Sequence, residues 1–171
     1  MDRLRSTWIL SLALVGGCAS GPQDTTLDIV SDVCEPTAVI APADVTGAQL
    51  ASIDEALAMW ARLGFDRMRL AGSEEAEVAP EAQRIAIVFD DAAEIFHGVY
   101  DDEHGVVYIN RALSDDHERA VTVAHELGHA FALLHVSSGA RVSVMNPANL
   151  VVEPNDGDAA DLVSLWGPCT D

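Results

Sequence analysis

The sequence predicts an α/β (α+β) domain with a small twisted mixed sheet, an N-terminal helix, a central helix and a C-terminal helix. Three observations favour this fold class. Apolar side chains recur at helical spacing in residues 46–63 and 114–131, whereas residues 84–89 and 105–110 are short segments rich in β-branched side chains. Apolar residues make up 49% of the chain, which is enough to build a hydrophobic core, and the length of 171 residues suffices for one such core but not for two.

The first predicted helix covers residues 46–63. Thr46 can cap its N-terminus, and Gly64 can end it. Four apolar side chains fall on one stripe of this helix: Leu50, Ile53, Leu57 and Trp60. This stripe is expected to pack against the sheet.

The middle of the chain is expected to form the sheet. An acidic loop at residues 71–83 precedes the strand Arg84–Phe89, which we expect to be central. A turn at residues 90–94 leads to two further strands, at residues 96–100 and 105–110.

Two helices follow the predicted sheet. The first begins at residues 114–116, where Asp115 and Glu118 have the spacing of a capping box, and it ends near Phe131. The second fits residues 158–166 and stops before Gly167 and Pro168.

The charge of the chain excludes one class of partner. Asp and Glu number 28 against 9 Lys and Arg, which gives a formal net charge of -19, and every basic residue is Arg. A domain this acidic is repelled by phosphate backbones, so we expect no nucleic-acid partner.

The first residues are predicted to be an export signal. Arg3 and Arg5 precede a short apolar segment, residues 8–15, that is too short to span a membrane. Leu14–Cys18 (LVGGC) resembles a bacterial lipobox, which implies cleavage before Cys18 and a lipid anchor on it. We therefore expect a signal peptide at residues 1–17, a tether at 18–44, one domain at 45–171, and a lipoprotein of the cell envelope, outer membrane rather than inner. An ordinary secretory peptide is the alternative.

Three cysteines are consistent with export. If Cys18 carries lipid, Cys34 and Cys169 remain as an even pair. A disulfide between them would join the two ends of the domain, and two free thiols are the alternative.

The residues with the clearest chemistry are His125-Glu126-Leu127-Gly128-His129. On a helix, residues four apart lie on one face, so His125 and His129 can bind one ion, and neutral imidazoles suit Zn²⁺. Glu126 cannot readily join them, but it can act as general base for a zinc-bound water.

The third ligand requires the helix to end. His135 could not reach the same ion from a continuous helix, so the chain must turn back near residues 131–132. A carboxylate such as Glu153 or Asp156 is the alternative third ligand.

Residues 125–135 (HELGHAFALLH) resemble the long zinc signature of the metzincin metallopeptidases. That resemblance implies His135 as third ligand, with Ala132 at the position of a helix-ending Gly, where a left-handed Ala costs about 1–2 kcal/mol. Residues 143–147 (SVMNP) resemble the Met-turn, which implies that Met145 packs below the histidines. Pro147 makes the chain similar to the matrixin-like branch.

The resemblance implies a compact zinc endopeptidase with one catalytic Zn²⁺, a protein or peptide substrate and Glu126 as the catalytic base. It also places residues 105–110 (GVVYIN) at the substrate-binding edge of the sheet, although a central strand is the alternative. Calcium at the acidic residues between 90 and 103 is a weaker expectation. We expect a monomer. The alternative function is a non-catalytic binding or structural lipoprotein that keeps the fold.

Overall fold

The structure is a computed structural model and describes residues 27–72 and 83–170. The predicted signal peptide and the lipidation site Cys18 lie outside the described residues. Within the described part of the chain, no helix is long and apolar enough to cross a membrane.

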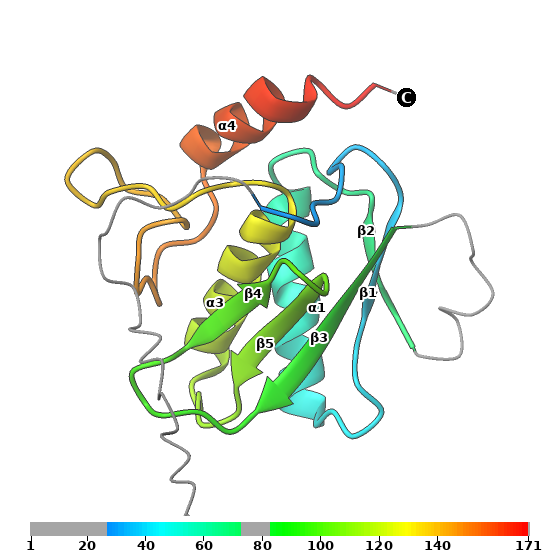
Figure 1. Cartoon of the computed structure of the whole chain (residues 1–171), viewed down its shortest axis with the longest axis vertical. Coiled ribbons are helices and arrows are strands. Elements are labelled where there is room, and N and C mark those ends of the chain that lie inside the picture. Colours follow the sequence, from blue (N-terminus) through cyan, green and yellow to red (C-terminus); the bar gives the residue numbers. More distant parts are fainter. Residues whose placement is uncertain (1–26, 73–82, 171) are drawn as a thin grey trace, which may run out of the picture.

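A five-stranded mixed sheet forms the front layer of the molecule (Figure 1). Its strands follow the order β2-β1-β3-β5-β4. Neighbouring strands are parallel except β4 and β5, which are antiparallel. The bounds of the strands are β1 Thr37–Ile40, β2 Met68–Ala71, β3 Gln83–Asp90, β4 Gly98–Asp101 and β5 Val106–Asn110. The predicted mixed α/β fold class is confirmed.

Helices α1 (Gly47–Ala61) and α3 (Asp116–Ala130) lie together behind the sheet (Figure 1). Trp60 fixes their contact because its indole is fully buried and donates a hydrogen bond of 3.1 Å to the carbonyl of Ala124. Thr46 and Gln49 form a capping box that starts α1 as its sequence predicts. This contact therefore fixes the position of the two helices relative to each other beneath the strands.

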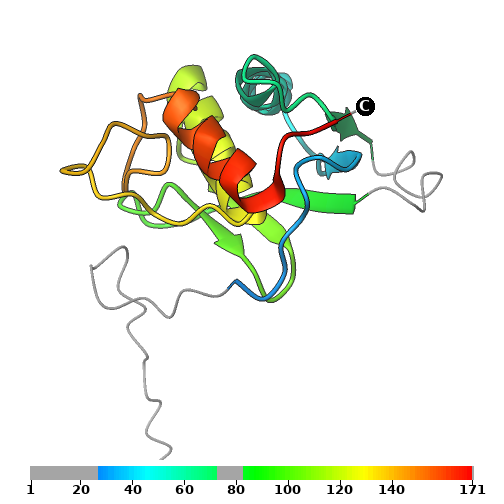
Figure 2. The ribbon, with the colours of Figure 1, turned by 90° about the horizontal axis from the view of Figure 1, so that it is seen from above.

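Helix α4 (Asp156–Trp166) crosses one end of α3, as the view from above shows (Figure 2). The Trp166 indole donates a hydrogen bond of 2.9 Å to the carbonyl of Phe131, just past the end of α3. Cys34 and Cys169 form the predicted disulfide, with 5.0 Å between their Cα atoms. The C-terminal segment is thereby fixed to the N-terminal part of the domain.

Two predictions about the sheet are wrong. The tether predicted at residues 18–44 contains β1, which lies between β2 and β3, so the folded domain begins before residue 45. Residues 105–110 are not at an edge, because β5 pairs with β3 on one side and with β4 on the other. The edge strand on this side is β4.

Candidate active site

Helix α3 places the first two histidines. Asp115 caps its N-terminus by accepting hydrogen bonds from the main-chain N–H groups of His117 and Glu118. His125 Nδ1 lies 2.7 Å from the carbonyl oxygen of Val144, and His129 Nδ1 lies 2.7 Å from that of Leu133. A carbonyl only accepts hydrogen bonds, so both Nδ1 atoms carry the proton, and both Nε2 atoms present a lone pair.

A left-handed turn at Ala132 brings the third histidine back to the helix. Ala132 has φ 73° and occupies the position where the metzincin signature has Gly. The N–H of Leu133 donates to the carbonyl of Gly128, and the N–H of Ala132 donates to that of His129, both at 2.9 Å. These two bonds are those of a Schellman motif, which ends the helix as the sequence requires.

Replacing Ala132 by Gly is expected to stabilise the protein by about 1 kcal/mol, because Gly adopts positive φ without the clash that Cβ causes. Urea unfolding measures this change in the free energy of unfolding. Ala130→Gly, in the last turn of the same helix, is the matched control and is expected to destabilise. A destabilised Ala132→Gly variant would contradict this account of the turn.

The three imidazoles meet at one point. His135 Nε2 lies 3.2 Å from His125 Nε2 and 3.2 Å from His129 Nε2. Two nitrogens that each lie about 2.0–2.1 Å from a tetrahedral zinc ion are about 3.3–3.4 Å apart, so the spacing suits Zn²⁺. Among the described residues, this is the one group of His, Cys, Asp and Glu side chains that could hold a metal ion.

Burial keeps the helical histidines neutral. It lowers the pKa of His125 to about 4 and the pKa of His129 to about 3. Burial also lowers the pKa of His135. Neutral imidazole is the form that binds metal, so the site is ready for a cation at neutral pH.

Glu126 follows His125 directly on helix α3. Its carboxyl is buried, and burial raises its pKa to about 8, although a main-chain hydrogen bond from Tyr100 on β4 acts in the opposite direction. A nearby cation would favour the ionised form and bring the pKa down. With a cation bound nearby, the carboxyl could therefore be ionised at neutral pH and accept a proton.

Two glycines that sequence reasoning did not single out allow this packing. A Cβ at Gly98 would lie 2.9 Å from Glu126 Oε1, so Gly98 lets β4 approach the carboxyl closely. A Cβ at Gly128 would lie 2.5 Å from Met145 Sδ, so Gly128 leaves room for that side chain. Neither position is at positive φ, and no sequence pattern reveals the contact.

Met145 is buried in the predicted turn and packs against α3 at Gly128. The N–H of Val136, next to His135, donates a hydrogen bond of 2.9 Å to the carbonyl of Met145. The turn is therefore joined to the segment that carries the third histidine, and the packing of Met145 below the histidines stays a prediction.

Asp158, in the first turn of α4, anchors this turn and was missed as a site residue. Its carboxylate is completely buried and accepts a hydrogen bond from the Ser143 hydroxyl, as well as one of 3.0 Å from the N–H of Val144. It also accepts a hydrogen bond of 3.1 Å from the N–H of Asn155 and one of 3.0 Å from the guanidinium of Arg141. The capping box formed by Asn155 and Asp158 was the available signal, but it indicates only a helix start.

Replacing Asp158 by Asn is expected to destabilise the protein by about 3 kcal/mol, because a buried charged acceptor with several donors is lost. Thermal unfolding in the presence of a chelator measures the effect without a metal contribution. Asp161→Asn is the matched control, since Asp161 also pairs with Arg141 but its side chain is 49% exposed. Equal effects of the two substitutions would contradict the anchoring role.

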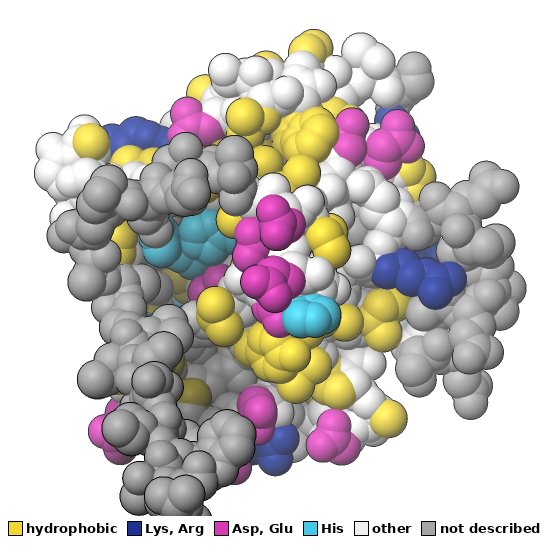
Figure 3. Space-filling view, in the orientation of Figure 1, with side chains coloured by type: hydrophobic (Ala, Val, Ile, Leu, Met, Phe, Trp, Pro, Cys, Tyr) yellow, Lys and Arg dark blue, Asp and Glu magenta, His cyan; other side chains and the backbone are white. Residues whose placement is uncertain are grey.

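A cleft of about 440 Å³ opens above these groups, between β4 and α3. His side chains gather beside hydrophobic ones on the left of the space-filling view (Figure 3). Among the described lining residues, Glu126 is the one carboxyl and there is no Arg. Its walls include six apolar side chains: Leu27, Ile95, Phe96, Val99, Leu134 and Ala148.

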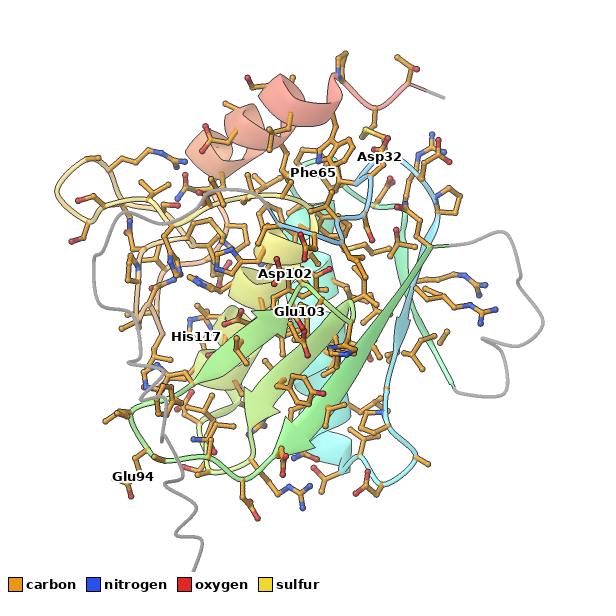
Figure 4. All side chains as sticks on the ribbon, viewed as in Figure 1. Asp32, Phe65, Glu94, Asp102, Glu103 and His117 are labelled. Carbon is orange, nitrogen blue, oxygen red and sulfur yellow. A yellow bond between two sulfur atoms is a disulfide. The ribbon has the colours of Figure 1, made fainter. Side chains whose placement is uncertain are left out.

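Other predicted ligands lie elsewhere. Glu153 forms an ion pair with Arg62 at 2.8 Å, and Asp156 is in the first turn of α4. Asp102 and Glu103 lie over the turn that joins β4 to β5 (Figure 4). The acidic residues between 90 and 103 form no metal-binding group within the described part of the chain, so the calcium prediction finds no support.

Comparison with known proteins finds a similar structure but no related sequence. No protein-family profile matches the chain, and no curated protein is detectably related to it by sequence. A solved structure that is similar is that of high choriolytic enzyme 1, a hatching-enzyme zinc protease from the medaka fish Oryzias latipes, with a TM-score of 0.51 and 12% sequence identity. The match covers 86% of this chain and 98% of that chain.

This chain shares its fold with a zinc protease. The similarity shows the fold alone, so the zinc-peptidase activity and the matrixin-like branch stay predictions.

Proposed function

We propose that the chain is a zinc-dependent endopeptidase of the metzincin type, close to the matrixin-like branch, that hydrolyses peptide bonds within proteins. The observation that carries the proposal is the convergence of three imidazole nitrogens beside a buried carboxyl in an open cleft. A zinc ion bound by His125, His129 and His135 would supply a Lewis acid that polarises a peptide carbonyl and makes a water molecule more acidic.

Glu126 has the role of proton carrier. It would accept a proton from the attacking water and pass it to the amine that leaves when the peptide bond breaks. The hydrogen bonds from His125 and His129 to main-chain carbonyls hold their rings in place throughout. No other carboxyl among the described lining residues can share the task.

The edge strand β4 supports an extended protein substrate. It lines the cleft with Gly98, Val99 and Tyr100 and pairs only with β5 among the described strands. Its outer main-chain groups, apart from the Tyr100 N–H that donates to Glu126, can therefore bind a peptide by strand addition. Val99 is 55% exposed and Ile95 is 77% exposed, so the wall favours apolar substrate side chains.

The experiment uses the zinc-loaded protein with Cys18→Ala, which removes the proposed lipid site. Incubation with an unfolded protein, followed by mass spectrometry, is expected to yield internal fragments, which a chelator abolishes and added zinc restores. Glu118→Gln, earlier on the same helix, should retain activity. A folded, zinc-loaded protein that cuts no unfolded substrate would overturn the proposal and favour a non-catalytic binding lipoprotein.

We also infer that the chain is an exported lipoprotein with its anchor at Cys18. The residues that support this are the lipobox-like Leu14–Cys18 and the disulfide between the other two cysteines, which is typical of exported domains.

A further inference from the structure

The N-terminal segment of the described chain forms part of the cleft. Leu27, the first described residue, lines the cleft together with the histidines and β4. The chain therefore enters the folded domain at the cleft itself, and not at the opposite side of the molecule.

Hydrogen bonds hold this segment, which we call the strap (residues 27–33), on two sides of the cleft. On the sheet side, the N–H groups of Asp28 and Ile29 donate to Asp102 at 3.0 Å, and the Tyr100 hydroxyl donates to the carbonyl of Ile29 at 2.8 Å. Figure 4 places Asp102 at the end of β4 that the strap meets. These bonds fix the strap to the edge of the sheet.

On the helix side, the N–H of Ser31 donates to the carbonyl of Ala130 at 2.8 Å, next to His129. Val33 is buried, and Cys34 is fixed by its disulfide to Cys169. The strap is thus attached to the domain on both sides, and these contacts hold its first residue, Leu27, at the cleft.

The chain between the strap and the proposed lipid anchor at Cys18 is short. Cys18 precedes Leu27 by nine residues, so the two Cα atoms are at most about 30 Å apart. A compact domain of this size has a diameter of about 35 Å. An anchor on the opposite side could hold the cleft about 65 Å from the bilayer, whereas an anchor at the strap keeps it within about 30 Å.

We propose that the cleft works close to the membrane and acts on extended segments of lipid-anchored or membrane-spanning proteins that lie within about 30 Å of the bilayer surface. This inference rests on the proposed peptidase activity and on lipidation of Cys18. The net charge of -19 repels anionic head groups and keeps the domain from lying flat on them. Confinement to one surface raises the effective concentration of such substrates.

The test uses the full-length lipidated protein in phosphatidylcholine vesicles with two lipid-anchored reporters. Both carry the same cleavable sequence, either about 10 residues from the anchor or above a rigid helical spacer of about 60 residues, which spans about 90 Å. We expect the near site to be cut at least tenfold faster than the far site. Inserting about 40 Gly and Ser residues after Ser20 should bring the ratio close to one.

The soluble Cys18→Ala protein separates the two proposals. If it cuts both reporters equally while the anchored protein prefers the near site, the inference holds. Equal rates for the anchored protein overturn the placement of the cleft close to the membrane but leave the peptidase proposal standing. Absence of cutting by the soluble protein overturns the peptidase proposal itself.

Discussion

Replacing Glu126 by Gln is expected to lower kcat/KM for peptide hydrolysis by about 10³-fold, which corresponds to about 4 kcal/mol of transition-state stabilisation. Gln keeps the shape of the side chain but cannot accept and return the proton. Its zinc content should equal that of the parent, because Glu126 is not among the three side chains that could hold the ion. Fluorogenic peptide hydrolysis with parallel metal analysis measures both quantities.

Glu118→Gln is the control for this experiment, since it makes the same chemical change on the same helix outside the cleft. Retention of full activity by Glu126→Gln would remove Glu126 from the mechanism. Loss of zinc together with activity would instead assign it a role in holding the metal.

The same substitution is expected to stabilise the metal-free protein at neutral pH. Burial raises the pKa of Glu126 from its ordinary 4.5 to about 8 in the folded state. Between these values the unfolded chain loses a proton that the folded chain keeps, so the carboxyl costs stability as pH rises. Gln carries no such cost, and Glu126→Gln should gain about 3 kcal/mol at pH 7 and nothing near pH 4.

Urea unfolding of both proteins in a chelator, at several pH values, measures this difference. The lowered pKa values of the histidines destabilise both proteins as pH falls below 6.5. This contribution is the same in both proteins, so it drops out of the difference between their free energies of unfolding. A constant difference between pH 4 and pH 7 would contradict the environment described for Glu126. A gain in stability with loss of activity would show that the buried carboxyl is retained for function.

The sequence predicted the parts of the site that depend on local spacing. His125 and His129 meet because four residues make about one helical turn, and the same geometry required a turn before His135. That turn occurs at Ala132, where the metzincin resemblance placed it. The disulfide followed from an even count of cysteines once Cys18 was set aside.

What the sequence did not predict depends on which elements lie side by side. Strand β1 has four residues between Pro36 and Pro42, too few for an alternating pattern to distinguish it from a tether. The prediction of β5 as the edge was wrong because strand order is decided by how the chain crosses over, which leaves no mark in residues 105–110. Gly98 and Asp158 likewise act through contacts with distant segments.

Zinc content per folded chain, determined by metal analysis after dialysis, tests the three-histidine site directly. We expect one zinc per parent chain, close to none for His135→Ala, and one for His104→Ala, whose ring pairs with Asp101 at 2.9 Å outside the cleft. Circular dichroism would verify that each variant is folded. Full zinc content in folded His135→Ala would contradict the three-histidine site and return the third ligand to a carboxylate.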